Sequence, residues 1–180
     1  HEDVVLTPIF NVLTLINHGY PLIPLTIEPR GWTLQEDQVI KGDLNLKGNA
    51  LDVNGKTLTI QGNLLHSGGT LSVNGGKVVI AGDYRLQTPQ VDGSYTYSHG
   101  VLQMVNETDN VLVNGDFVMD STAEHGGRLS AGLLEVKGNF TQQSSHPNGS
   151  SYNIYTTGTH KVKLSGVAKQ TISMEDPASS

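Results

Sequence analysis

A repeated motif, apolar-x-Gly-Asp/Asn-apolar, constrains the fold of this chain more than any other feature. The motif begins at Ile40, Ile60, Ile80, Val113 and Val136, and a degenerate copy begins at Leu164. The motif glycines are separated by 20, 20, 33, 23 and 28 residues. Two successive spacings of 20 residues predict one structural unit that is repeated along the chain.

Two sets of short strands are predicted within each repeat. Apolar residues occupy every second position before the motif glycines, which is the pattern of a half-buried strand. A second set, Leu51-x-Val53-Asn54-Gly55 and Leu71-x-Val73-Asn74-Gly75, ends in Asn-Gly, a turn signal. Two strands joined by Asn-Gly could also form a tight hairpin. A meander of hairpins, however, does not generate a fixed period across loops of unrelated length.

The sequence therefore predicts an all-β fold, a right-handed single-stranded parallel β-helix (solenoid) with about 20 residues per basic coil. Coils stacked about 4.8 Å apart place equivalent residues in columns. The right hand follows from the strong preference of parallel crossover connections. One inward column is expected to contain Leu44, Leu64, Tyr84, Phe117 and Phe140, and one outward column Val39, Thr59, Val79, Leu112, Glu135 and Lys163.

Two regions are expected, an N-terminal capping segment over residues 1–30 and the solenoid over residues 31–180. Thr7-Pro8 and Gly19 favour a capping helix over Pro8–His18, although alternating Val12, Thr14 and Ile16 could equally form a strand. We expect residues 1–30 to cover the uncharged part of the outward column, with a role in docking a partner as the alternative. No distinct cap follows the strand pattern of Ile172–Met174, so we expect the solenoid to continue beyond residue 180.

Composition and charge limit the classes of function. The net charge is −6, and the 11 Lys and Arg residues are scattered, which argues against binding of nucleic acid. Only 16% of residues are charged, and the polarity comes mainly from Asn, Gln, Ser and Thr, a balance typical of β-rich secreted proteins. No cysteine is present. The sequence contains no uninterrupted run of about 18 apolar residues, so insertion into a membrane is not expected.

Three long insertions, Arg85–Gly100, Val118–Gly132 and Thr141–Thr159, are expected to lie above one another on one edge of the solenoid. Tyrosine rings combine an apolar face with a polar tip and can therefore form a platform for sugar rings. The alternative is that these side chains pack the insertions onto the body. The candidate ligand-binding residues are Tyr95, Tyr97, His99, His125, Arg128, His146, Tyr152 and Tyr155.

The column of motif acids and amides suggests two interpretations. Oxygen ligands in a column could bind calcium, but the short ligand-rich segments of calcium loops do not occur here. A ladder of hydrogen bonds that holds the bends is the favoured interpretation. The column consists of Asp43, Asn63, Asp83, Asp116 and Asn139.

Catalysis is not expected, and neither is a metal or a cofactor. Enzymes that cleave polysaccharides need clustered acids with a nearby base, and the three arginines of this chain are far apart in the sequence. Glu107 and Asp109 are close in sequence, but we expect them on a turn that faces solvent. Asp116 and Asp120 have no base that their spacing identifies. The histidines show none of the zinc-binding spacings.

Several segments resemble the solenoid segments of large extracellular proteins of Firmicutes. The resemblance rests on Gly31-Trp32-Thr33-Leu34, Gly42-Asp43-Leu44, Asn54–Ile60, Gly62-Asn63-Leu64 and Gly158–Val162, and it covers residues 31–175. It implies a β-solenoid that occurs beside other surface modules, and it implies no catalytic residue. A looser resemblance to the tāpirins, cellulose-binding proteins with a β-helix core, implies carbohydrate binding.

These expectations combine into a non-catalytic structural or adhesion module of a larger bacterial surface or secreted protein. Its partners would be the flanking domains of the same chain, and a polysaccharide or another surface protein. Two alternatives remain open. The first is a carbohydrate-binding module that uses the Tyr and His residues of the insertions, and the second is a polysaccharide lyase or hydrolase.

Overall fold

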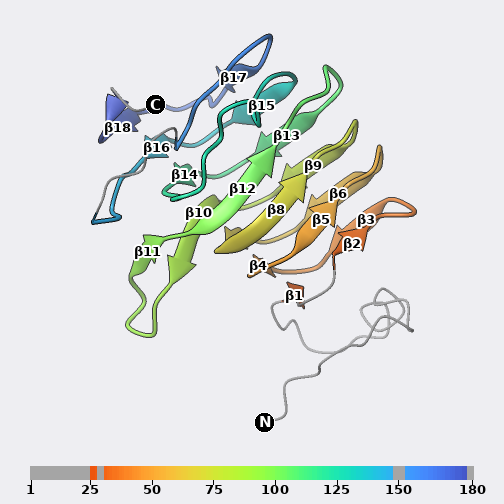
Figure 1. The fold of residues 1–180 in the computed structure, drawn as a ribbon, viewed down its shortest axis with the longest axis horizontal. Coiled ribbons are helices and arrows are strands. Elements are labelled where there is room, and N and C mark those ends of the chain that lie inside the picture. The colour runs from red at the N-terminus through yellow and green to blue at the C-terminus, as the bar shows by residue number, and fades with distance from the viewer. Residues whose placement is uncertain (1–24, 28–30, 148–152, 178–180) are drawn as a thin grey trace.

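Figure 1 shows the computed structural model of the chain, which describes residues 25–27, 31–147 and 153–177. These residues form strands and turns, and none of them lies in an α-helix. The expected capping helix over Pro8–His18 and most of the expected capping segment lie outside the described residues. The fold class is all-β, as predicted.

The strands form three parallel sheets, which we call A, B and C. Sheet A contains, in order, β1 (Leu25–Ile27), β4 (Leu44–Leu46), β7 (Leu64–His66), β10 (Tyr84–Pro89), β14 (Phe117–Met119), β16 (Phe140–Gln142) and β18 (Ile172–Met174). Sheet B contains β2 (Trp32–Thr33), β5 (Ala50–Asp52), β8 (Gly68–Ser72) and β12 (His99–Gln103), and sheet C contains β3 (Gln38–Ile40), β6 (Thr57–Ile60), β9 (Lys77–Ile80), β13 (Asn110–Val113), β15 (Leu133–Val136) and β17 (Lys161–Leu164). The chain passes through A, B and C in turn, and we call one such passage a layer.

Equivalent residues of successive layers pair directly. Ile40 pairs with Ile60, and Ile60 pairs with Ile80, so the 20-residue period of the sequence is the period of the layers. The longer repeats keep the same register, since Val113 pairs with Ile80 and with Val136. The prediction of parallel pairing between equivalent repeat positions is therefore confirmed, and the alternative of antiparallel hairpins between the repeats is wrong.

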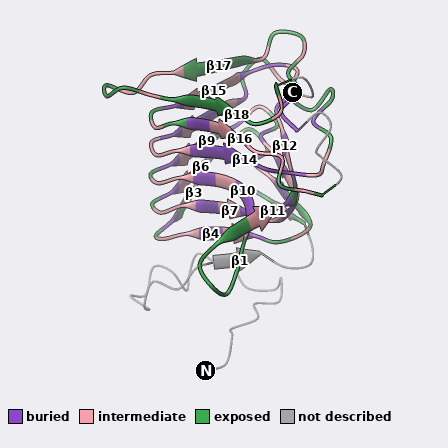
Figure 2. Cartoon of the chain, turned by 90° about the vertical axis from the view of Figure 1, so that its left-hand side faces the viewer, coloured by how far each residue is buried: buried purple, intermediate pink, exposed green. Residues whose placement is uncertain are grey.

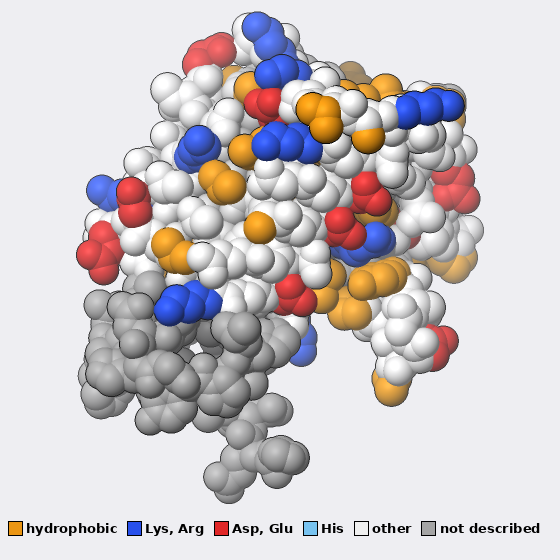
Figure 3. Space-filling model, turned by 180° about the vertical axis from the view of Figure 1, so that it is seen from behind, with side chains coloured by type: hydrophobic (Ala, Val, Ile, Leu, Met, Phe, Trp, Pro, Cys, Tyr) orange, Lys and Arg blue, Asp and Glu red, His pale blue; other side chains and the backbone are white. Residues whose placement is uncertain are grey.

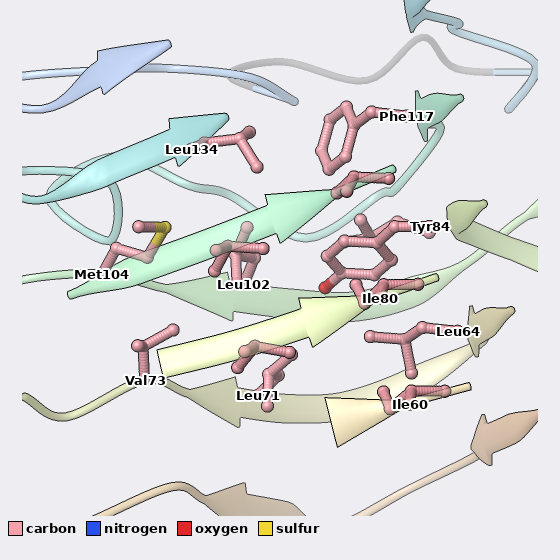
Figure 4. Packing of buried hydrophobic residues seen from close by; sticks show 14 of the residues in the cluster. Ile60, Leu64, Leu71, Val73, Ile80, Tyr84, Leu102, Met104, Phe117 and Leu134 are labelled. Atoms are coloured by element: carbon pink, nitrogen blue, oxygen red, sulfur yellow. The ribbon is translucent and has the colours of Figure 1, made fainter. Parts of the chain in front are cut away.

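The core lies between the three sheets, where the inward side chains meet (Figure 4). The predicted inward column is confirmed: its members pair in sequence along sheet A and are at most 6% exposed. Its aromatic part is continuous, because the ring centroids of Tyr84 and Phe117 are 5.3 Å apart and those of Phe117 and Phe140 are 5.2 Å apart.

The predicted outward column on sheet C has the expected register from Val39 to Lys163. Val39 is 44% exposed, whereas its neighbours in the strand, Gln38 and Ile40, are buried. Most of residues 1–30, which are expected to cover this column, lie outside the described residues.

The predicted Asn-Gly turns follow sheet B. Asn54 and Asn74 have φ angles of 51° and 45°, and Gly55 and Gly75 follow at 70° and 78°. Two successive residues in the left-handed region require glycine and favour asparagine, which is the physical basis of the signal. Each turn directs the chain from sheet B into sheet C (Figure 1), on the side of the stack away from sheet A, whose strands face the viewer in Figure 2.

Candidate functional site

The three insertions lie beside one another, and each follows a strand of sheet A. The first begins in β10 and forms an antiparallel hairpin with β11 (Tyr95–Tyr97). A parallel bridge joins Ser98 to Ser121 of the second insertion, and the Ser121 backbone N–H donates to Oδ1 of Asn153 in the third at 3.2 Å. The second and third insertions also meet at a bridge between Leu129 and Thr156.

One aromatic group forms where the first and third insertions meet. The Tyr97 ring lies edge-on to His146 at 4.6 Å and to His99 at 5.7 Å between centroids. Nδ1 of His99 is 2.6 Å from the Thr122 hydroxyl of the second insertion. Tyr95 is 42% exposed, and the Arg85 guanidinium lies 4.9 Å from the centre of its ring. These rings therefore make contacts from one insertion to another, and Tyr95 also contacts Arg85 in β10, the strand in which its hairpin begins.

The other candidate residues lie apart from this group. His125 is fully buried, with Nδ1 3.0 Å from the carbonyl oxygen of Ala123 and Nε2 accepting from the Leu102 N–H at 3.1 Å. Arg128 donates to Oε1 of Gln103 at 2.7 Å. Tyr155 is 38% exposed and lies beside Gly126, and Tyr152 lies outside the described residues. The eight candidates thus do not form one continuous surface within the described part of the chain.

A buried polar group was not anticipated from the sequence. His66 is fully buried, with Nδ1 3.0 Å from the Tyr84 hydroxyl and Nε2 3.1 Å from the Gly69 carbonyl oxygen. Burial lowers the pKa of His66 to about 4, and burial likewise lowers the pKa of His125 to about 4. Both imidazoles are therefore neutral near pH 7. The signal for His66 was its place two residues after inward Leu64, because inward positions recur with period two.

The column of motif acids and amides is a ladder of hydrogen bonds, as favoured from the sequence. Oδ1 of Asp43 accepts from the Asn63 N–H at 2.6 Å, and Oδ1 of Asn63 accepts from the Asp83 N–H at 2.8 Å. The same bond continues from Asp83 to Asp116 at 2.9 Å and from Asp116 to Asn139 at 2.7 Å. Because one oxygen of each rung accepts a backbone N–H of the next layer, the column has a structural function.

The motif glycines are explained by the same ladder. A Cβ atom at Gly82 would collide with Oδ1 of Asn63, and Gly62, Gly115 and Gly138 are in the same position relative to the preceding rung. At Gly42, where no motif acid precedes, no heavy atom lies within 4 Å of such a Cβ. Gly62, Gly82, Gly115 and Gly138 therefore make room for the rung of the layer before each of them.

The candidate acids are occupied in turns. Asp109 is 1% exposed, and its carboxylate accepts from the N–H groups of Gly75 at 2.6 Å, Val105 at 2.7 Å and Asn106 at 3.0 Å. The expectation that Asp109 faces solvent is therefore wrong, because the backbone N–H groups of two turns converge on its carboxylate.

The other two acids also have partners. The exposed Glu107 accepts from the Thr159 hydroxyl. Asp120 is 1% exposed and accepts from the Ser145 hydroxyl at 2.7 Å. Over the described ranges, no three His, Cys, Asp or Glu side chains are grouped so that they could hold a metal ion.

Comparison of the chain with protein-family models, with curated proteins and with solved structures found no match. Within the part of the chain that the structure describes, no helix has the length and hydropathy needed to cross a membrane.

Proposed function

We propose that this chain is a right-handed parallel β-solenoid that serves as a non-catalytic structural or adhesion module of an extracellular or cell-surface protein. In this function it holds other domains of the same protein at a fixed distance and orientation. The right hand rests on the general preference of parallel crossover connections. The extracellular location rests on the composition and on the resemblance to surface proteins of Firmicutes.

The observation that carries the proposal is the ladder that runs along the stack. Four side-chain-to-backbone bonds connect Asp43, Asn63, Asp83, Asp116 and Asn139 in successive layers, and Oδ1 of Asn139 accepts from the Thr171 N–H at 2.9 Å. Parallel backbone pairing and stacked aromatic rings run in the same direction. Polar side chains that would otherwise be available for chemistry thus connect one layer to the next, which favours a rigid rod.

The distribution of charged side chains on the surface is more typical of a spacer or adhesion module than of a protein that attracts a charged partner. On the face in Figure 3, cationic and anionic side chains are interspersed among neutral ones. An interspersed surface keeps a protein soluble without attracting a polyanion. The two ion pairs that the described residues form, Arg85 with Asp83 and Lys163 with Glu135, are partly exposed and add little stability.

Rigidity can be measured directly, because the chain contains no cysteine and spin labels can be placed at will. Labels on Val39→Cys and Lys163→Cys lie five strands apart in sheet C, so a narrow distance distribution centred near about 24 Å plus the label arms is expected. The matched pair Thr59→Cys and Lys163→Cys lies one layer closer and should be shorter by about 5 Å. A broad distribution, or equal distances for the two pairs, would contradict a rigid stack.

A carbohydrate-binding function is the second candidate, favoured by the exposed Tyr95 beside the group of Tyr97, His99 and His146. Pull-down on insoluble polysaccharides and a glycan array separate the two functions. If the chain is a purely structural module, no saturable binding to polysaccharides or glycans is expected. Binding that is lost in Tyr95→Ala/Tyr97→Ala but kept in Val91→Ala, at the exposed tip of the same hairpin, would replace the structural proposal with the carbohydrate-binding one.

A further inference from the structure

The edge of β12 that faces away from β8 is paired in an unusual way. Sheet B ends at β12 (Figure 1), and parallel bridges join the chain on either side of this strand to the second insertion, at Ser98 and at Met104. Between the two bridges the second insertion leaves the sheet, and the Leu102 N–H donates to Nε2 of His125 at 3.1 Å. An imidazole nitrogen therefore takes the place that a backbone carbonyl oxygen has in a parallel ladder.

The part of the second insertion that carries this imidazole, residues 123–127, forms a flap over the edge of β12. His125 is fully buried, whereas the other four residues of the flap are exposed or partly exposed. Among the hydrogen bonds of the described residues, the bond between Leu102 and His125 is the one that joins the flap to β12. Gly126 and Gly127 follow His125, and Gly127 has a φ angle of 69°, a conformation that glycine adopts freely. The flap therefore has one buried anchor beside a pair of glycines that can act as a hinge.

The hydrogen-bond partners of His125 determine which ring nitrogen carries the proton. Nδ1 is 3.0 Å from the carbonyl oxygen of Ala123, which can only accept, so Nδ1 carries the hydrogen. Nε2 is then the atom with the lone pair, as its bond from the Leu102 N–H requires. A second proton, on Nε2, would set two N–H donors against each other. The closed flap is therefore compatible only with a neutral His125.

The other buried histidine, His66, lies on the opposite side of β12 and differs in this respect. A Cβ atom at Gly100 would lie 2.8 Å from Nε2 of His66, so the imidazole packs directly against the strand. Nε2 of His66 donates to the Gly69 carbonyl oxygen, and Nδ1 faces the Tyr84 hydroxyl. A hydroxyl group can donate or accept, so this contact survives protonation of Nδ1. Protonation of His125, and not of His66, therefore breaks a bond to β12.

The charges near His125 disfavour a proton while the flap is closed. Burial is the largest cause that lowers the pKa of His125 to about 4, and the Arg128 cation of the same insertion lowers it as well, against the effect of the Ala123 carbonyl group. Burial, and then the charge of a protonated His125, lower the pKa of His66 across the strand. Glu124 is exposed. A proton is therefore bound more readily when the ring leaves the core and reaches water.

We propose that residues 123–127 are an acid-operated flap, in which a proton on Nε2 of His125 breaks the bond to Leu102 and the flap swings away from β12 about Gly126 and Gly127. Opening uncovers the Leu102 N–H, and an unpaired strand edge of this kind can accept an added strand. Opening also separates Gly126 from the Tyr155 ring of the third insertion, which lies beside it. The flap does not depend on the structural function proposed above, because the layers stay paired when it opens.

Hydrogen exchange of single amides, measured by NMR, tests the flap. If the pKa of His125 returns from about 4 to its ordinary value of 6.5 on opening, the population of the open flap increases about 20-fold between pH 7 and pH 5. The protection factor of the Leu102 N–H, corrected for the intrinsic pH dependence of exchange, should fall by the same factor. The Val73 N–H, which donates to the Gln103 carbonyl oxygen on the opposite edge of β12 at 3.0 Å, is the internal control and should keep its protection.

His125→Gln is the matched variant, because the glutamine side-chain oxygen can accept from the Leu102 N–H but does not titrate. In this variant, the protection of Leu102 should be the same at pH 7 and pH 5. Nitrogen-15 NMR of the unmodified protein at pH 7 should find the imidazole proton on Nδ1 of His125 and on Nε2 of His66. The proposal is overturned by a pH-independent protection of Leu102 in the unmodified protein, by an equal loss of protection at Val73, by a fall that persists in His125→Gln, or by a proton on Nε2 of His125 at pH 7.

Discussion

Replacing Gly82 by alanine places a methyl group where the ladder has an oxygen. The new Cβ would collide with Oδ1 of Asn63, the atom that accepts the Asp83 N–H at 2.8 Å. To make room, the Asn63 amide has to move, and the hydrogen bond is lost or lengthened. Losing a partly buried bond costs about 1–1.5 kcal/mol and the overpacking a further 1–3 kcal/mol, so a decrease of about 3 kcal/mol in the free energy of unfolding is expected.

Gly42→Ala is the matched control for this prediction. Gly42 has the same place in its repeat, but no heavy atom lies within 4 Å of an added Cβ. Its φ angle, like that of Gly82, is outside the left-handed region. We expect the free energy of unfolding to be unchanged, or raised by less than about 1 kcal/mol because alanine restricts the unfolded chain.

Urea and thermal unfolding followed by circular dichroism measure the difference. For a chain of this size, 3 kcal/mol corresponds to a decrease in Tm of about 6–12 °C. Asn63→Ala/Gly82→Ala should lose less stability than the sum of the two single variants, because the truncated Asn63 no longer collides with the methyl group. Equal losses at Gly42 and Gly82, or strict additivity, would refute the role assigned to the ladder.

Two further predictions concern the core. Because the pKa values of buried His66 and His125 are lowered from 6.5 to about 4, the unfolded chain binds protons that the folded chain does not. Stability in urea should therefore fall as the pH decreases from about 6.5 to about 4, and a flat profile would contradict neutral burial. Phe117→Ala, at a fully buried ring between two other rings, should cost about 3–5 kcal/mol in urea unfolding. Thr141→Ala, on the outer side of the neighbouring strand, should change the free energy of unfolding by less than about 0.5 kcal/mol, and similar losses for both variants would contradict the aromatic stack.

The parts of the fold that repeat could be predicted from the sequence, because one residue pattern recurs wherever the same physical constraint recurs. Ile60 and Ile80 hold the same position in their repeats, and this predicted the register of their strands. Asn63 and Asp83 also hold the same position, and this predicted the ladder. The periodicity indicates which positions are equivalent, and parallel pairing then places them above one another.

Features that occur once could not be predicted in the same way. The turn of the β10–β11 hairpin includes Asp92-Gly93, a turn signal, but it lies inside an insertion that we expected only to be a loop. Asp109 is close to Glu107 in the sequence, and only the fold shows that three backbone N–H groups point at Asp109. The position of the candidate His125 inside the body was likewise hidden in the sequence, because the Leu102 N–H that donates to its Nε2 comes from β12.

The inward column of sheet A has a consequence for how the chain finds its own order. Layers of equal length and similar sequence could stack with one layer skipped, and the backbone bonds alone would not prevent it. The change from leucine at 44 and 64 to tyrosine at 84, and the contact of the Tyr84 hydroxyl with His66, exist only between true neighbours. A misordered stack would leave the buried Tyr84 phenol without its partner and a gap beside it, so the graded column favours the native order of the layers around Tyr84.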